Sequence, residues 1–405
     1  MKFGRRLLLW VSALLATAPV WAAPPVAERA FASDARGPFQ TGTVEELWID
    51  SQREETTTSD PNDKRYLMVQ IWYPAAFKGD PPRAPYVLHR ELYPTDEYSK
   101  WLDEVAHVRT NSVLNAPMAT APTRFPVLIY NPGGYHPHFS GTAQTEFLAS
   151  HGYVVVAIGH TGAGMNRIER FTDGSTYRPD QNDPRLSDAE DVELPKVEWL
   201  ERQVQRFSAL MMPVHVKDIG FMLDTLTKLN ADRRSRFYQR LDVDRAGSMG
   251  WSLGGALSLQ ASRDDPRIKA AVNLDGWLYT DVMNTGTPRP ILQMHGGAEV
   301  EQLLVAGDAA RIEQATVATS YNWRLYRNST GGWYDVTLDR ATHAHFSDRM
   351  LFESPQSQLI HPRLAHDIVN GYVLEFFDKY LRGRTDTPLL SGKVGFPEAR
   401  LRISK

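Results

Sequence analysis

The chain has 405 residues, of which 42% are hydrophobic and 23% are charged, a composition typical of globular proteins. Its formal net charge of −3 and the lack of a long basic run disfavour the basic surface that nucleic-acid-binding proteins need, so we expect no nucleic-acid partner. The absence of cysteine excludes disulfides and thiolate metal sites, and a lipoprotein anchor with them.

The first 22 residues have the pattern of a secretory signal. Three cations precede an apolar run at residues 7–20, which is shorter than the roughly 20 apolar residues that a transmembrane helix needs. Small residues then stand at the positions that signal peptidases require. We therefore predict cleavage after Ala22 or Ala23, and a bacterial protein that is periplasmic or secreted.

From residue 23 to 405 we predict one α/β domain. Residues 44–50 and 66–73 are rich in aromatic and β-branched side chains and are predicted strands. Residues 126–131 and 153–160 are continuous apolar runs, as expected of parallel strands that are buried on both faces. The helical spacing of residues 140–152 between them completes a strand–helix–strand unit.

The second half continues this alternation after a polar surface excursion at residues 161–195. Further elements are predicted in chain order: helices at 197–211 and 214–229, separated near Pro213; a helix at 253–263; strands at 269–275 and 289–296; a hairpin or strand pair within 322–338; and a helix at 363–383. The order predicts a mostly parallel sheet flanked by helices. An insertion at residues 84–116 either caps a pocket or packs over one edge of the sheet.

Ser252 stands between glycines in the sequence Gly-Trp-Ser-Leu-Gly-Gly (residues 250–255). A nucleophilic serine needs a strand, a sharp turn and then a helix, and glycines allow that turn without steric clash. The alternative is that Gly250 and Gly254 only allow close helix–sheet packing. A serine hydroxyl also needs a base, which in turn needs an orienting acid.

His343 is the predicted base, because it follows a strand and precedes the long final helix. His345 is the second choice, and His295 at the end of a strand is interpreted as structural. A His343/His345 metal pair lacks a third ligand, so we expect no metal and no cofactor.

Asp275 is the predicted acid, because it ends the strand that follows the serine, and active sites in such sheets form at the carboxyl ends of strands. Glu299, one strand later, is the alternative. For Asp275 itself, the competing interpretation is a turn or helix cap.

An oxyanion hole requires backbone N–H groups aimed at the developing negative charge. Leu253, directly after the serine, supplies one. The Gly-rich loop at 131–135 is predicted to supply the other from Gly134 or Tyr135. His136 and His138, which follow, are interpreted as loop or rim residues.

These motifs together resemble the plasma and type II intracellular platelet-activating factor acetylhydrolases, a branch of the α/β-hydrolases near the dienelactone-hydrolase-like proteins. The resemblance runs over residues ~60 to 385 and rests on FPVLIYNPGG, FLASHGYVVVAIGH, GWSLGGA, NLDGW, HAHFSD and YVLEFFDKYL, in that order. It implies the α/β-hydrolase fold, with Ser252 as nucleophile, Asp275 as acid, His343 as base, and Gly134 and Leu253 as oxyanion donors.

Two positions depart from the family pattern. The family often has His before the serine, where this chain has Trp251, and often Ser-His-Gly in the oxyanion loop, where this chain has Asn-Pro-Gly at 131–133. The elbow also resembles that of secreted polyester-degrading hydrolases.

The resemblance implies a serine esterase that acts on short or oxidised acyl chains at the sn-2 position of glycerophospholipids, with transient contact to a membrane surface. The alternatives are a general carboxylesterase, a dienelactone-hydrolase-like enzyme or a polyester hydrolase with the same triad, and a non-catalytic binding protein on the same scaffold.

Overall fold

The structure is a computed structural model, and it describes residues 37–94, 100–163, 168–180, 183 and 194–404. The predicted signal at residues 1–22 lies outside the described residues.

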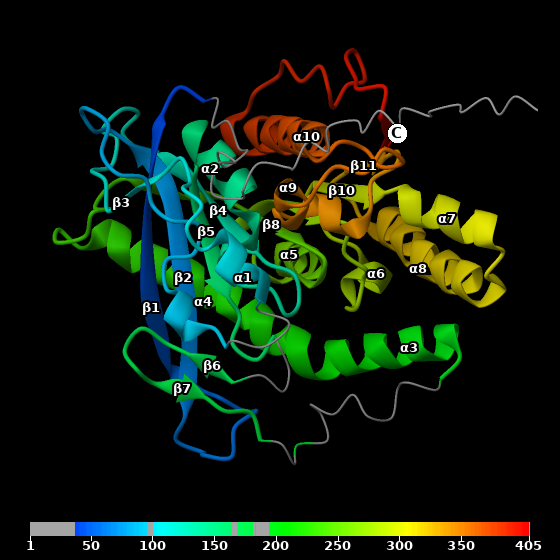
Figure 1. The fold of residues 1–405 in the computed structure, drawn as a ribbon, viewed down its shortest axis with the longest axis horizontal. Helices are drawn as coiled ribbons and strands as arrows, with labels where there is room; N and C mark the ends of the chain where they lie inside the picture. Colours follow the sequence, from blue (N-terminus) through cyan, green and yellow to red (C-terminus); the bar gives the residue numbers. More distant parts are fainter. Residues whose placement is uncertain (1–36, 95–99, 164–167, 181–182, 184–193, 405) are drawn as a thin grey trace, which may run out of the picture.

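A ten-stranded sheet forms the centre of the molecule (Figure 1). Its strands are β1 (Gln40–Glu54), β2 (Lys64–Ala75), β3 (Val113–Leu114), β4 (Phe125–Asn131), β5 (Val154–Gly159), β8 (Leu241–Trp251), β9 (Ile268–Leu274), β10 (Ile291–Gly296), β11 (Trp333–Leu338) and β12 (Ala399–Ile403). The spatial order is β12-β11-β10-β9-β8-β4-β5-β2-β1-β3. A separate two-stranded ribbon joins β6 (Glu169–Arg170) to β7 (Thr176–Tyr177).

The six central strands, β11 to β5 in this order, run parallel, whereas β2 and β12 are antiparallel to their neighbours. Every residue of β4 is buried, which explains why that strand is apolar throughout instead of alternating. The predicted α/β class with a mostly parallel sheet is confirmed. The prediction of a single domain from residue 23 stays a prediction, supported by the one sheet that joins residues 40–54 to residues 399–403.

Helices cover both faces of the sheet. They are α1 (Lys100–Val105), α2 (Thr142–Ser150), α3 (Lys196–Arg206), α4 (Met212–Ala231), α5 (Leu253–Asp264), α6 (Val282–Thr285), α7 (Ala298–Ala306), α8 (Ala309–Asn328), α9 (Arg349–Phe352) and α10 (Pro362–Arg382). One apolar cluster joins the sheet to α2 and α10, and a second joins it to α4 and α5. Within the described part of the chain, no helix combines the length and apolarity that crossing a membrane requires.

Two predictions of secondary structure are wrong. Residues 322–328, predicted as a strand, form the last turns of α8, because Tyr321 and Leu325 are buried together on one helical face. Residues 197–229 are not interrupted at Pro213. A π-helical turn at Phe207–Met211 connects α3 to α4 directly, and it lies just ahead of the proline, whose missing N–H would otherwise disrupt the helical hydrogen bonds.

The insertion at residues 84–116 was predicted either to cap a pocket or to pack over one edge of the sheet, and parts of it do each. Tyr86 and Leu102 are buried in the cluster that contains α2 and α10, so part of the insertion packs against the sheet layer. Tyr93 and Trp101 line a small second cavity of about 130 Å³, next to the loop at 132–138. Tyr98 lies outside the described residues.

Candidate active site

Ser252 occupies the sharp turn between β8 and α5. Its backbone has φ 56° and ψ −123°, a conformation that residues other than glycine rarely adopt. The turn is held by the Ser252 N–H, which donates to the Leu274 carbonyl on β9 at 2.9 Å. This is the strand–turn–helix geometry that an exposed nucleophile requires.

The flanking glycines are required by close backbone packing. A Cβ on Gly254 would lie 2.0 Å from the carbonyl oxygen of Asn131, and one on Gly250 would lie 2.4 Å from the backbone of Gly254. The start of α5 therefore lies directly against the end of β4. The two glycines therefore allow close helix–sheet packing, as one interpretation predicted, and this packing forms the sharp turn that the other interpretation required.

Asp275 and His343 form a hydrogen-bonded pair at the carboxyl ends of β9 and β11. Asp275 Oδ2 accepts from His343 Nδ1 at 2.7 Å, and Asp275 Oδ1 accepts from the Gly296 N–H at 3.0 Å. Asp275 also has a positive φ, 56°, so the chain turns sharply as it leaves β9. With Nδ1 donating to the carboxylate, the neutral imidazole has its lone pair on Nε2.

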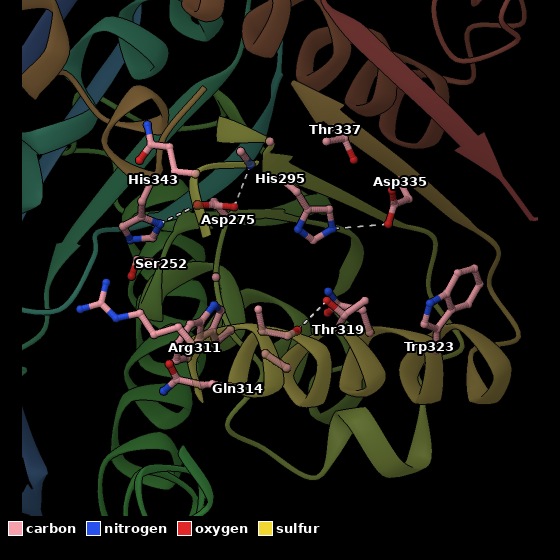
Figure 2. Close-up of a pocket in the computed structure, with 18 of the residues that line it drawn as sticks. Ser252, Asp275, His295, Arg311, Gln314, Thr319, Trp323, Asp335, Thr337 and His343 are labelled. Atoms are coloured by element: carbon pink, nitrogen blue, oxygen red, sulfur yellow. Dashed lines mark hydrogen bonds and ion pairs between the residues drawn. The ribbon is translucent and has the colours of Figure 1, made fainter. Parts of the chain in front are cut away.

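Ser252, Asp275 and His343 line one cavity of about 1230 Å³ (Figure 2). In Figure 2, Ser252 lies beside the His343 ring and Asp275 lies on the ring's other side. The structure thus brings together the three residues predicted as nucleophile, acid and base, although their catalytic roles stay predictions.

The loop after β4 lies against this elbow. A Cβ on Gly133 would lie 3.4 Å from Ser252 Cβ, and one on Gly134 would lie 3.6 Å from the Leu253 side chain. Leu253 is the first residue of α5, where backbone N–H groups have no acceptor within the helix. Tyr135 has φ 65°, so the chain turns again immediately after the glycines. The Gly-rich loop therefore lies against the turn that bears the serine, whereas Tyr135 lines the smaller cavity together with Leu253.

The alternative site residues lie elsewhere or have other partners. His345 is buried, accepts from the Thr342 N–H at Nδ1 and pairs with the Ile360 carbonyl at Nε2, which is a structural role. Glu299 lies in the first turn of α7, and its side chain is outside the described set. His138, interpreted as a loop or rim residue, begins a short helical turn after the Gly-rich loop and is buried, with Nε2 2.8 Å from Glu45 Oε2.

Two other histidines border the site. His136 is a rim residue, and its ring packs edge-on against Trp251 at 4.6 Å between centroids. His295 lines the cavity, with Nε2 3.4 Å from Asp335 Oδ2. Burial alone would lower the pKa of His295, but the Asp335 carboxylate raises it above its usual value.

The sequence patterns missed a buried polar chain behind the elbow. Asn131 donates to Ser248 Oγ at 3.1 Å and Ser258 Oγ at 2.9 Å, and its own Oδ1 lies 3.0 Å from His160 Nε2. His160 Nδ1 in turn lies 2.9 Å from Asp218 Oδ2, and that carboxylate pairs with Arg65 at 2.7 Å. The Arg65 guanidinium, against the cost of burial, holds the pKa of Asp218 well below its usual range.

This hydrogen-bonded network of side chains fixes Asn131, and with it the end of β4 from which the Gly-rich loop departs. The one available signal was the polar residue at the end of each apolar run, Asn131 and His160, since side chains at these strand ends meet at one edge of a parallel sheet. Among the residues that the structure describes, no group of three or more histidine, cysteine or acidic side chains is arranged to hold a metal ion.

Comparisons with known proteins point to one group. A family model described as platelet-activating factor acetylhydrolase, isoform II, matches residues 36–303. A platelet-activating factor acetylhydrolase from Canis lupus familiaris is 24% identical over 196 residues, which are 45% of this chain and 42% of that protein. A probable 1-alkyl-2-acetylglycerophosphocholine esterase from Arthroderma benhamiae is 27% identical over 173 residues, 42% of this chain and 37% of that protein. The chain thus matches less than half the length of these curated relatives.

Among solved structures, a ferulic acid esterase from Streptomyces cinnamoneus superimposes with a TM-score of 0.64 at 25% identity. The match covers 90% of this chain and 97% of that protein. Together with the parallel sheet and its flanking helices, it confirms the predicted α/β-hydrolase fold.

Proposed function

Because the chain belongs to the platelet-activating factor acetylhydrolase, isoform II, family, we propose that it is a serine esterase whose triad is Ser252, His343 and Asp275. The observation that carries the proposal is the 2.7 Å hydrogen bond between His343 and Asp275 beside a serine on a strained strand–helix turn. Such a triad gives a serine hydroxyl the base that it otherwise lacks.

In the proposed reaction, Ser252 Oγ attacks the ester carbonyl while His343 Nε2 takes its proton. Asp275 keeps the imidazole in the required tautomer and stabilises the imidazolium. The negative oxygen of the tetrahedral intermediate accepts from the Leu253 N–H and from the N–H of Gly134 or Tyr135. His343 then protonates the leaving alcohol, and the acyl-enzyme is hydrolysed by a water that His343 deprotonates.

The first candidate substrate is a glycerophospholipid with a short or oxidised acyl chain at the sn-2 position. The names of the relatives from Canis lupus familiaris and Arthroderma benhamiae support it. The small cavity at Tyr93 and Trp101, next to Leu253, offers an apolar surface beside the elbow for such a substrate.

The test is fluorophosphonate labelling of the wild type and Ser252→Ala, with acetate release from a short-chain phospholipid measured in EDTA. We expect labelling and release in the wild type and neither in the variant. Wild-type protein that is not labelled would overturn the triad and favour the non-catalytic binding protein. Labelling without phospholipid hydrolysis would overturn only the substrate.

The second candidate is a general carboxylesterase for bulky polar or aromatic esters, including polyesters. It is favoured by Trp199 and Trp277, which line the large cavity at Ser252, and by the ferulic acid esterase that shares the fold. A panel of aryl esters, polyesters and short-acyl phospholipids separates the two candidates by kcat/KM.

Export to the periplasm or the medium is part of the same proposal and rests on the sequence of residues 1–22. N-terminal sequencing of protein recovered from the periplasm and the medium tests it. We expect a first residue of Ala23 or Pro24, and a chain that keeps Met1 would contradict export by cleavage.

A further inference from the structure

The cavity at Ser252 continues as a long arm beside α8. Residues of that helix that line the arm recur every three or four positions: Arg311, Gln314, Ala315, Ala318, Thr319, Asn322, Trp323 and Tyr326. At 1.5 Å per residue, this stripe is about 22 Å long. Figure 2 shows the opposite wall, formed by His295 near the end of β10 and by Asp335 and Thr337 on β11.

One flank of the stripe borders the core, because Tyr326 belongs to the apolar cluster of Tyr321 and Leu325, and Ala318 packs against that cluster. The rest of the stripe is mostly polar or small, unlike a helix face that packs into a core. Its middle consists of Ala315, Ala318 and Thr319, so the helix wall there projects little into the cavity. The total volume of about 1230 Å³ exceeds the roughly 300–1,000 Å³ of pockets for single small ligands. The arm thus offers far more space than an acetyl group occupies.

The chemistry of the arm excludes a long alkyl chain as its natural occupant. Gln314 donates to the Lys196 carbonyl at 3.2 Å and Thr319 to the Ala315 carbonyl at 2.8 Å, so the side-chain oxygen of each can still accept a hydrogen bond from water. A buried alkyl chain would remove these oxygens and the Asn322 amide from water without replacing those bonds. Each such loss costs about 1–3 kcal/mol.

Four cations line the cavity, and its three arginines all have carboxylate partners, which disfavours an anion as the occupant; Arg400 pairs with Asp339 at 2.8 Å, and Lys196 is the fourth cation. Arg402 pairs with Asp335 at 2.9 Å, and Arg311 lies 3.5 Å from Asp308. Both guanidinium groups are thereby balanced by carboxylates that line the same cavity.

Exposed aromatic rings stand at both ends of the arm. Trp277 is 39% exposed near Ser252, and Trp323 is 43% exposed at the far end. Flat rings beside amide and hydroxyl groups match a sugar, because the C–H face of a sugar ring packs on an aromatic face while its hydroxyls hydrogen-bond in the sugar plane.

We propose that this arm binds the sugar part of a carbohydrate ester, with the ester group at Ser252 and the sugar residues extending along α8 toward Trp323. The inference rests on the proposed esterase chemistry and gives the second candidate function its substrate class. The reaction is the hydrolysis already described: the acyl–oxygen bond breaks, the acyl group passes through Ser252 to water, and the sugar hydroxyl leaves with a proton.

Two matched variants test the arm. Thr319→Trp places a large ring in the middle of the arm, and Thr316→Trp places the same ring outside it. Both threonines are exposed on α8, and each bonds the carbonyl four residues earlier at 2.8 Å, so the substitutions disturb the helix equally. Thr319 lines the cavity and Thr316 does not.

The substrates are partially acetylated xylo- and gluco-oligosaccharides, with 4-nitrophenyl acetate as the small ester. We expect Thr319→Trp to lower kcat/KM on the oligosaccharides about tenfold or more, mainly through KM, because a lost binding contribution of 1.4 kcal/mol is a factor of ten. On 4-nitrophenyl acetate it should stay within about twofold of wild type, as should Thr316→Trp on both substrates.

The outcomes distinguish a failure of the proposed esterase function from a failure of the proposed sugar-binding arm. Wild type that does not hydrolyse 4-nitrophenyl acetate overturns the proposed function itself. Wild type that hydrolyses it but leaves the acetylated oligosaccharides intact, or prefers a short-acyl phospholipid, overturns the sugar arm. Equal effects of the Thr319 and Thr316 variants would also overturn it.

Discussion

The indole N–H of Trp251 donates to the backbone carbonyl of His343 at 3.0 Å. The residue before the proposed nucleophile therefore holds the backbone of the proposed base, and the two rings also pack at 5.0 Å between centroids. At this position the family often has histidine. The tryptophan thus couples the β8–α5 turn to the loop after β11, two segments that are 92 residues apart.

Trp251→Phe removes this hydrogen bond and keeps an aromatic ring. We expect kcat to fall about 3- to 10-fold with little change in KM, because a loosened His343 spends less time in line with Ser252. Unfolding free energy should fall by about 1 kcal/mol, the net value of one hydrogen bond. Steady-state kinetics and urea unfolding measure both.

Trp48→Phe is the control, because Trp48 also donates an indole hydrogen bond, to Glu46 at 2.8 Å on β1. It should lower stability without lowering kcat. If both variants retain full kcat, Trp251 does not position His343.

Asp275→Asn tests the acid of the proposed triad. An amide at this position offers an N–H or a carbonyl to His343 but no negative charge, and it stabilises the wrong tautomer of the imidazole. We expect kcat to fall about 10³- to 10⁴-fold. Circular dichroism should stay that of the wild type, since the Gly296 N–H keeps an acceptor when the amide oxygen faces it. Activity within tenfold of wild type would move the acid to another residue, with Glu299 the first to test.

Asp348 is the last residue of the HAHFSD motif, and its contacts explain why that position holds an acidic residue. It lies on the loop that contains His343, and its carboxyl accepts from the Ala143 N–H in the first turn of α2 and from the Tyr86 hydroxyl at 3.1 Å. Burial raises the pKa of Asp348 well above its usual range, an effect that these hydrogen bonds only partly oppose. The residue anchors the loop after β11 to the opposite side of the site.

The sign of its pH effect follows from proton binding. Between the ordinary Asp pKa of about 3.9 and the raised pKa in the fold, the folded chain holds a proton that the unfolded chain has released. Asp348 therefore makes stability fall as pH rises through that window. Asp348→Asn lacks this titration, so its stability relative to wild type should increase from pH 4 to pH 8. Urea unfolding at several pH values measures this, and a pH-independent difference would contradict it.

The candidate site residues could be predicted from the sequence mainly because they follow the carboxyl ends of predicted strands. Ser252, Asp275 and His343 follow β8, β9 and β11, and parallel strands place such residues at one edge of the sheet. Residues 322–328 were mispredicted because alternating large side chains in a short stretch also fit a helix, and the buried contact of Leu325 decides between the two. The Trp251–His343 bond and the arm beside α8 join distant segments, so no local pattern reveals them, and for the Asn131–His160–Asp218 network the only local signal is the polar residue that ends two apolar runs.

Gly254→Ala tests whether the turn needs glycine for close approach. The new Cβ would lie 2.0 Å from the Asn131 carbonyl oxygen and 2.5 Å from that of Pro132, and both are backbone atoms. Relief requires a shift of the Gly-rich loop, so we expect a loss of about 1–3 kcal/mol or more in unfolding free energy, with a reduced kcat. Gly220→Ala in α4 is the matched control, since its Cβ would meet nothing closer than 3.7 Å. That variant should gain roughly 0.5–1 kcal/mol, because alanine favours a helix interior over glycine. Gly254→Ala with the stability and kcat of the wild type would show that the loop and the elbow do not depend on this contact.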